Sequence, residues 1–539
     1  MKLRFHREFS QTPSGSIGYI PACFLKATGR KIRFLRIESS ELRSNHYYGA
    51  RHLGKVDRID LAGLALHERA VARDLEMLGV PAANWPAKIE DATGQPVLDV
   101  LVVGAGMNGI AAAGSLMFKG IRNIAVVERA RPGREGPWLT FARMDTLRSP
   151  KTLTGPALGV PSLAFRAWYE AKYGLNVWEA LYKIHNRTWV EYLSWLQKVL
   201  ALPVRHGAAL EALEPAGPLV RAVLNEDGAR RNVLARRVVL ATGRAGAGGV
   251  FWPDFIDRAL VPDLAAHTND DIDFAALRGK SIALLGGGAS AWDNAATALE
   301  RGAARVDMYV RRPYLPQVNK GRGSAFPGFL HGWSSLPDAE RWATMVYLND
   351  LQAPVPHETV NRTTRLSDFH IHFRTGIETA SRADGKVAVK IAGQDETRMH
   401  DFLIVGTGFN VDPALIPELA SYAPNIATWY DRYQPAPDLR RRDMERFPYL
   451  GPGFELTEKT PGSDPTLGQI HLVNFGAHAS HAGIASDIPG VNIAAERVAG
   501  AIVTSLFRED IHHMRRKVEA YNEPELAGTP FFVPESERS

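Results

Sequence analysis

Two glycine-rich segments of the same form constrain the fold of this 539-residue chain more than any other feature. Each has an apolar run, a glycine-rich turn, a helix-like stretch and a second apolar run, at Leu98–Arg129 and Ser281–Arg312. The first glycine of such a turn allows a tight bend, the second lets the backbone approach a pyrophosphate, and the third residue lets the helix pack against the strand. Two copies predict an α/β fold with two Rossmann-like dinucleotide-binding domains, whose turn residues are Gly104, Gly106 and Gly109 in the first copy and Gly286, Gly288 and Ala291 in the second.

The residues that end the second apolar run differ in charge between the two copies. The first copy ends in Glu128 and Arg129, and the second ends in Arg311 and Arg312. A carboxylate at this position hydrogen-bonds the ribose hydroxyls of a nucleotide, whereas arginine accommodates a 2′-phosphate. We therefore expect FAD at the first copy and NADPH at the second, with a merely solvated strand end as the alternative for the arginine pair. Two such cofactors predict a flavin enzyme that takes electrons from NADPH.

Composition narrows the function further. The net charge of +6 suits anionic cofactors, and no nucleic-acid-binding module is recognisable, so we expect no nucleic-acid partner. The single cysteine, Cys23, excludes a redox-active cysteine pair and a cysteine-based metal cluster within the chain. The uncharged run Val100–Phe118 is long enough for a membrane helix, but its four glycines favour a buried strand, turn and helix. We therefore expect a cytoplasmic protein that does not enter a membrane.

The order of the segments predicts the domain organisation. Two strands that each end in a glycine-rich turn, Arg237–Gly243 and Phe402–Phe409, bracket the second copy, so the chain leaves the first domain and returns to it. Apolar spacing predicts a helix over Leu61–Leu78, and an aromatic-rich helical region over 163–201 is expected to be core. The expected parts are an N-terminal extension (1–95), the FAD-binding domain in two parts (96–278 and 401–510), the NADPH-binding domain (279–400, with an insert at about 320–357) and a C-terminal tail (511–539).

On these motifs the chain resembles the class B flavoprotein monooxygenases over roughly residues 97–505. GGGASAWD matches the NADPH motif GxGxSAxD of that group, and LATG at 240–243 and GTGF at 406–409 match its two linker motifs. Two motifs are altered: REGPW at 134–138 stands where a glycine-rich Trp motif is usual, and VPDLAAHT at 261–268 keeps only the tail of FxGxxxH. The stretch TLRSPKTLTG looks more like amino-acid N-hydroxylases, which favours nitrogen oxidation over Baeyer–Villiger chemistry. The resemblance places Ser290 at the NADPH site and Gly408 in the second linker turn.

The resemblance implies a monooxygenase cycle on a small-molecule substrate. NADPH reduces the flavin, O2 adds to give a C4a-(hydro)peroxyflavin, and the protein orients the cofactors and excludes water. Trp138 and Ser149 are expected beside the flavin, together with the turn that contains Asp487. Asn474 is the candidate that steers the oxygenating flavin through its amide, although a buried turn-forming role is an equal alternative. His478 is the candidate proton donor or substrate contact.

Several alternatives stay open at the level of sequence. His478 and His481 stand three residues apart, but no third ligand is near in sequence, so we expect no metal. An NADPH-dependent flavin reductase or oxidase would use the same two nucleotide sites, and a non-catalytic nucleotide-binding protein would also retain them. Substrate identity and oligomeric state cannot be derived from these residues.

Overall fold

The computed structural model describes residues 60–538, so most of the expected N-terminal extension lies outside the described residues. A seven-stranded sheet contains the first fingerprint, in the order β3-β2-β1-β6-β5-β4 with β15 pairing with β6. Strands β1, β2, β3, β6 and β15 pair in parallel, whereas β4, β5 and β6 form an antiparallel meander. The strands are β1 (Leu98–Val103), β2 (Ile124–Glu128), β3 (Val204–His206), β4 (Ala208–Ala216), β5 (Leu219–Glu226), β6 (Ala229–Leu240) and β15 (Ile470–Leu472).

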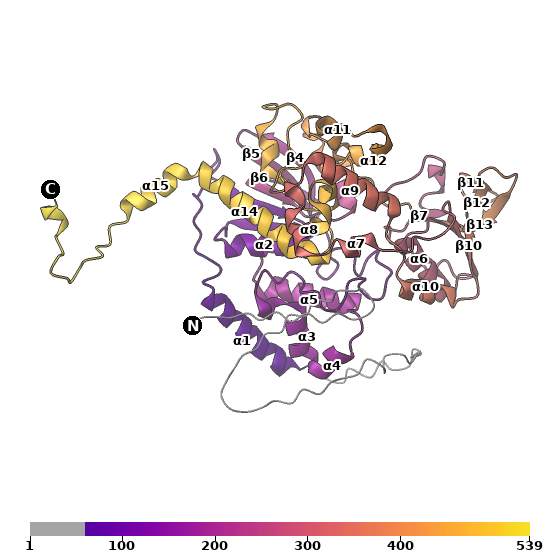
Figure 1. Cartoon of the computed structure of the whole chain (residues 1–539), viewed down its shortest axis with the longest axis horizontal. Coiled ribbons are helices and arrows are strands. Elements are labelled where there is room, and N and C mark those ends of the chain that lie inside the picture. The colour runs from indigo at the N-terminus through magenta and orange to yellow at the C-terminus, as the bar shows by residue number, and fades with distance from the viewer. Residues whose placement is uncertain (1–59, 539) are drawn as a thin grey trace, which may run out of the picture. The chain divides into compact units, whose positions relative to one another are not determined.

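Apolar helices cover this sheet because its central strands are buried almost end to end. Helix α2 (Met107–Phe118) follows the first glycine turn, and the long helix α14 (Val491–Glu509) packs alongside it (Figure 1). Helix α1 (Leu61–Met77) confirms the helix expected over Leu61–Leu78. Helix α15 (Ile511–Ala520) has no buried residue and projects away from the sheet (Figure 1).

Three aromatic-rich helices pack beside α2: α3 (Phe165–Tyr173), α4 (Leu175–Ala180) and α5 (Asn186–Val199). Their rings contact one another, with centroid distances of 5.2 Å between Phe165 and Tyr192 and 5.3 Å between Trp189 and Tyr192. The expectation that these aromatics are core is confirmed for the buried Trp168, Trp178, Trp189, Tyr192 and Trp195. Tyr182 is the exception, with 68% of its surface exposed.

The second fingerprint lies in a five-stranded parallel sheet with the order β10-β9-β8-β14-β7. Two sheets, each with parallel strands around its own fingerprint, confirm the predicted fold class. Strands β7 and β14 pair in this second sheet although the predicted boundaries, 279–400, exclude them. The elements are β7 (Ala265–His267), β8 (Ser281–Leu285), α6 (Ala289–Glu300), β9 (Arg305–Val310), α10 (His357–Thr364), β10 (Phe369–Phe373) and β14 (Phe402–Val405).

Two smaller groups of elements complete the described chain. A three-stranded antiparallel sheet packs against the second sheet through buried Ile377, Val387 and Val389; its strands are β11 (Ile377–Ala383), β12 (Lys386–Ile391) and β13 (Thr397–His400). Short helices from the insert and the C-terminal third share another apolar cluster that contains Trp333, Trp342 and Trp429. These helices are α8 (Pro327–Gly332), α9 (Asp338–Leu351), α11 (Trp429–Arg432), α12 (Arg442–Glu445) and α13 (His478–His481), and α7 (Lys320–Gly323) precedes them in the insert without a buried residue.

The apolar run Val100–Phe118 divides into β1, a turn and α2, as expected for a buried strand–turn–helix unit. Among residues 60–538, one helical stretch passes a length and composition test for a membrane span, at Ile488–Glu509, which the sequence analysis did not single out. A core helix passes the same test, and seven residues of α14 are buried against the rest of the protein.

Candidate functional site

The first fingerprint folds into an open cradle at the end of β1. Gly104 has φ +99°, a conformation that L side chains rarely adopt. A Cβ added at Gly109 would lie 1.8 Å from the carbonyl oxygen of Gly104, so only glycine lets α2 approach the turn this closely. A Cβ added at Gly106 would meet nothing within 4 Å, which leaves room above the turn. The three glycines therefore have the separate roles that the motif predicts.

The start of α2 is suited to an anion. Its N-cap is Gly106, and no side chain caps the helix, so the first N–H groups of α2 are available to a phosphate. Glu128 ends β2 beside this turn, and its carboxylate accepts hydrogen bonds of 2.8 Å from the N–H groups of Ala105 and Ala130. Arg129 is exposed next to it. An open glycine turn, an uncapped helix start and an adjacent carboxylate fit the pyrophosphate and ribose of FAD.

The second fingerprint repeats this geometry at the end of β8. Gly286 has φ +113°, and a Cβ there would lie 2.3 Å from the carbonyl oxygen of Gly406. Gly288 is open, no side chain caps α6, and Ser290 is exposed in the first turn of that helix. Ala291 is buried, and a Cβ added at Gly406 would lie 2.9 Å from its methyl group, so a small residue is needed at both positions. These features fit a second nucleotide.

Arg311 and Arg312 follow β9 directly, and both are exposed. The guanidinium group of Arg312 makes one long contact of 3.5 Å with the carbonyl oxygen of Asp350. Neither side chain forms an ion pair within the part of the chain that the structure describes. Both are therefore available to an anionic group on a nucleotide bound at α6.

The two fingerprint regions are joined by an ion pair across their interface. Arg148, in the loop that follows the first fingerprint, donates to Asp293 of α6 at 2.8 Å. Asp293 is almost fully buried and also accepts from the hydroxyl of Thr359 at 3.1 Å. Burial raises the pKa of the Asp293 carboxyl, and the positive charge of Arg148 opposes that change. Asp293 of the GGGASAWD motif thus holds the first-fingerprint loop rather than lying free in the nucleotide site.

Asn474 links the end of β15 to the turn after β6. Its Nδ2 donates to the hydroxyl of Thr242 at 2.9 Å and to the carbonyl oxygen of Gly246 at 3.3 Å. Its Oδ1 accepts from the N–H of Gly476 at 2.8 Å. Because donor and acceptor are both engaged within the protein, these bonds support the turn-forming alternative, and a steering role for the Asn474 amide stays a prediction. At the corresponding second turn, the carbonyl oxygen of Gly408 accepts from the N–H of Phe251 at 2.9 Å.

Four side chains beside Asn474 form what we call the Arg244 cluster: Arg244 after β6, and Phe475, His478 and Asp487 from the segment after β15. The guanidinium group of Arg244 lies 4.5 Å from the centre of the Phe475 ring, and that ring stacks on His478 at 5.3 Å. Arg244 and Asp487 lie 3.9 Å apart, and their side chains are 49% and 57% exposed. Burial lowers the pKa of the Arg244 guanidinium group, and the negative charge of Asp487 opposes that change. The sequence analysis missed Arg244, although it directly follows the LATG turn.

The two histidines of this turn have different environments. His481 is buried, and its ring contacts the carbonyl oxygen of Gly451 at 3.0 Å and Arg497 at 3.1 Å. Burial lowers its pKa to about 3, so the ring is neutral. Burial also lowers the pKa of His478, whose Nδ1 has no hydrogen-bond partner, while Asp487 opposes that change. Within residues 60–538, no group of three or more His, Cys, Asp and Glu side chains is arranged to hold a metal ion.

The other two residues expected beside the flavin lie in the loop after β2. Trp138 contacts the edge of Trp189 at 6.1 Å, and its carbonyl oxygen accepts from the Asn186 amide at 3.2 Å. Ser149 is half-buried next to Arg148. No contact joins either of them to Asn474 or His478, so their role at the flavin stays a prediction.

The insert packs directly against the turn that carries His478. Trp333 donates from its indole N–H to the carbonyl oxygen of Ala479 at 3.4 Å, and Arg341 donates to that of Ser480 at 3.3 Å. Trp342 packs in the same apolar cluster as Ala479. The insert therefore covers one side of the turn that contributes to the Arg244 cluster.

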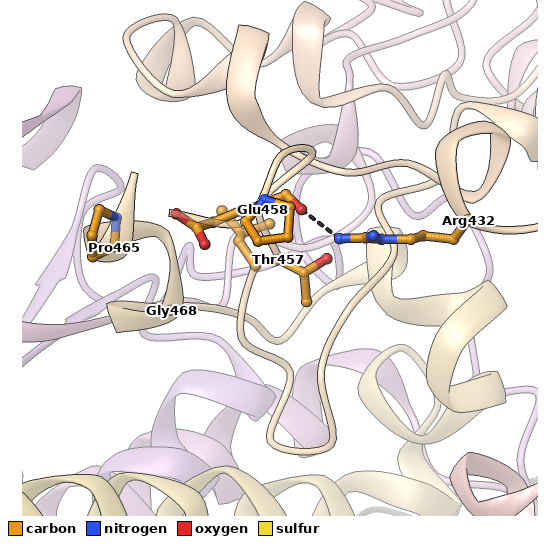
Figure 2. Close-up of a pocket in the computed structure, with 7 residues that line it drawn as sticks. Arg432, Thr457, Glu458, Pro465 and Gly468 are labelled. Carbon is orange, nitrogen blue, oxygen red and sulfur yellow. Dashed lines mark hydrogen bonds between the residues drawn. The ribbon is translucent and has the colours of Figure 1, made fainter. Parts of the chain in front are cut away.

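Two cavities lie elsewhere. One of about 330 Å³ is lined by residues between Arg432 and Gly468, with Arg432 donating to the carbonyl oxygen of Glu458 (Figure 2). Another of about 320 Å³ lies between Pro452 and Arg508 and includes the buried His471. Neither cavity is lined by a residue that was predicted to bind a cofactor or to act in catalysis. The two fingerprints and the Arg244 cluster therefore define the candidate site.

Comparisons with known proteins agree with this geometry. The family described as pyridine nucleotide-disulphide oxidoreductase matches residues 101–321. An FAD-dependent urate hydroxylase from Xanthomonas campestris pv. campestris is 39% identical over 469 residues, which cover 86% of this chain and 98% of that protein. Reduction of disulphides through a redox-active cysteine pair within the chain is excluded, because the sequence contains one cysteine.

Solved structures show the same fold at low identity. Ornithine hydroxylase from Pseudomonas aeruginosa has a TM-score of 0.61 at 17% identity, covering 76% of this chain and 100% of that chain. An ornithine N-hydroxylase from Kutzneria sp. 744 has a TM-score of 0.59 at 17% identity, covering 77% and 100%. The extensive match to the urate hydroxylase, at 39% identity along 98% of that protein, shows that the chain belongs to the family of the FAD-dependent urate hydroxylase.

Proposed function

We propose that this FAD-dependent monooxygenase hydroxylates urate or a closely related oxidised purine at the expense of NADPH. The observation that carries the proposal is 39% identity to an FAD-dependent urate hydroxylase along 98% of that protein. The balanced reaction is substrate–H + O2 + NADPH + H⁺ → substrate–OH + NADP⁺ + H2O. The two electrons of NADPH and two from the substrate reduce O2, with one oxygen atom entering the product and the other leaving as water.

The first fingerprint would hold FAD. The N–H groups at the start of α2 and the open space above Gly106 accommodate the pyrophosphate, and Glu128 is placed for the adenosine ribose. When bound, the flavin supplies the hydride-accepting and O2-activating chemistry, which no side chain of the protein can replace. The Arg148 loop and the Asn474 turn, both tied down by hydrogen bonds, would fix the two sides of that cofactor.

The second fingerprint would hold NADPH, with the 2′-phosphate on Arg311 and Arg312. Both guanidinium groups are exposed just beyond β9, where this phosphate is recognised in such folds. Changing both to alanine is expected to raise the KM for NADPH by about 10- to 100-fold, as for a lost charge-assisted contact, and to leave the KM for NADH unchanged. Equal losses for both nucleotides would contradict the 2′-phosphate assignment.

The protein's part in the chemistry is to orient the reactants and exclude water. The insert contributes buried Trp333 and Trp342, which pack against the turn that carries His478. Exclusion of water would matter because, in a site open to water, the oxidising equivalents of O2 are lost as peroxide instead of reaching the substrate. His478 stays the candidate proton donor, because its ring stacks on Phe475 within the Arg244 cluster.

The experiment follows three quantities with the purified holoenzyme: NADPH oxidation, O2 uptake and urate loss. The expected result is urate-dependent NADPH oxidation with one O2 and one urate consumed per NADPH, and little peroxide. NADPH oxidation that ignores urate and returns all electrons as peroxide would favour the oxidase interpretation instead.

The earlier expectation of nitrogen oxidation stays a prediction. It rests on the TLRSPKTLTG loop and on a fold shared with ornithine hydroxylases at 17% identity. Ornithine, lysine and cadaverine belong in the same assay, and coupling to one of them in place of urate would reverse the order of the two proposals. We also propose a cytoplasmic location, where NADPH is available, which cell fractionation tests.

The domain boundaries are likewise part of this proposal. Residues 96–278 and 401–510 would form the FAD-binding domain, with 279–400 inserted as the NADPH-binding domain. The separate sheets around the two fingerprints support this division, with the exception that β7 and β14, which these boundaries leave in the FAD-binding parts, pair in the second sheet.

A further inference from the structure

We propose that Arg244 is the residue that selects the substrate, and that it recognises the edge of a planar, anionic heterocycle of the urate class. This proposal rests on the proposed function. Arg244 immediately follows the LATG turn, and its guanidinium group lies over the Phe475 ring at 4.5 Å. This contact joins the segment after β6 to the turn after β15. Asn474 connects the same two segments by hydrogen bonds.

The guanidinium group of Arg244 is the free cation of this region. Nearby Arg148 is held by buried Asp293 at 2.8 Å, and Arg341 donates to the carbonyl oxygen of Ser480. Within residues 60–538, the Arg244 side chain forms no hydrogen bond, and its one ion-pair partner, Asp487, is 3.9 Å away. An exposed pair at this distance contributes little to stability, so a ligand with better geometry can replace it.

The planar groups of the Arg244 cluster favour a flat ligand. The Arg244 guanidinium, the Phe475 ring and the His478 ring form a layered set, with the two rings 27° apart in orientation. Because the guanidinium group lies over the Phe475 ring and its side chain forms no hydrogen bond among the described residues, its N–H donors are available to a second partner. A urate-class anion offers adjacent oxygen and nitrogen acceptors along one ring edge, which two parallel N–H groups can engage. A diamine such as cadaverine, which carries only positive charge, would instead be repelled by Arg244.

The test compares Arg244→Gln and Arg244→Lys with a matched control. Arg166 has the same two kinds of contact, lying 5.2 Å from the Trp178 ring and 2.6 Å from Glu170, but on helix α3. Arg244→Gln is expected to raise the KM for urate roughly 10- to 100-fold, as for a lost charge-assisted hydrogen bond, with FAD content and the KM for NADPH unchanged. Arg244→Lys should recover part of the affinity, because it keeps the charge and loses the paired donors. Arg166→Gln should behave like the wild type.

The outcomes separate this proposal from the proposed function. If the wild type hydroxylates urate and Arg244→Gln keeps the same KM for urate, the role of Arg244 is overturned and the function stands. If the wild type does not oxidise urate, the function fails, and binding decides the role of Arg244. Urate and xanthine are then titrated while the flavin absorbance is followed. Binding that Arg244→Gln loses supports the proposal, and an absence of binding to the wild type overturns it.

Discussion

Gly106 and Gly109 of the first fingerprint are three residues apart and have different structural roles. Gly106 has φ −70° and open space around it, so a side chain there is compatible with the fold. Gly109 is pressed against the Gly104 carbonyl, where a Cβ would lie 1.8 Å from the oxygen. One glycine therefore keeps space for a ligand, and the other keeps space for the protein itself.

This difference predicts opposite effects for the same substitution. Gly106→Ser should leave the stability of the FAD-free protein unchanged, because serine is a good N-cap, while its hydroxyl takes the N–H groups meant for phosphate. We expect FAD affinity to fall at least about tenfold. Gly109→Ser should lower the free energy of unfolding of the FAD-free protein by about 3 kcal/mol. Urea unfolding and FAD content measure both, and equal destabilisation by the two variants would contradict the assignment.

At the level of elements, a buried arginine ties β1, β6 and α14 together. Arg236 is fully buried and contacts Asp99 at 3.3 Å, Glu509 at 3.0 Å and Asp510 at 2.6 Å. Burial raises the pKa of the Asp99 carboxyl to about 6, and the charge of Arg236 opposes this change without cancelling it. Asp510 contributes to the rise as a second negative charge. Native Asp99 therefore holds its proton to a higher pH than unfolded Asp99 does.

A group whose pKa is raised on folding adds stability below its unfolded pKa, and this stability is lost as pH rises through the folded pKa. For Asp99 the window runs from 3.8 to about 6. The wild type should therefore lose about 2 kcal/mol relative to Asp99→Asn between pH 4 and pH 7. Urea unfolding of both proteins across this range tests it, and parallel pH profiles would show that Asp99 ionises normally in the native state.

At the level of the whole molecule, function requires the two nucleotide sites to face each other in a fixed way. The Arg148–Asp293 ion pair joins the loop after the first fingerprint to α6 of the second. Arg362 of α10 adds a second connection, donating to the carbonyl oxygen of Arg143 at 2.7 Å and pairing with Glu300 at 2.6 Å. These contacts hold the relative position of the two regions independently of any cofactor.

Loss of the Arg148–Asp293 pair should slow electron transfer more than it weakens cofactor binding. We expect Arg148→Ala to reduce the rate of flavin bleaching by NADPH about tenfold, which corresponds to 1.4 kcal/mol in the barrier, with FAD content unchanged. Anaerobic stopped-flow absorbance measures the rate, with Arg166→Gln as the control. An unchanged bleaching rate accompanied by lower thermal stability would mean that the pair is only structural.

Sequence alone determined the parts of this protein that depend on local contacts. The fingerprints predicted both strand–turn–helix units correctly, because the close approach at Gly109 and the positive φ at Gly104 involve residues near in sequence. The core role of the aromatic helices and the helix near Leu61 were predicted for the same reason, since periodicity reports burial. The flavoprotein family followed from the order of these local motifs.

Tertiary structure decided what depends on residues distant in sequence. The strands at 265–267 and 402–405 join the second sheet through pairing that no local pattern reveals. Asn474 satisfies its amide on a turn more than 200 residues away, and Arg148 finds Asp293 across 145 residues. Arg244 became visible as a candidate for substrate recognition only once folding brought Phe475 and Asp487 to it. A side chain's charge is written in the sequence, but whether that charge is free or already paired depends on which distant residues the fold places beside it.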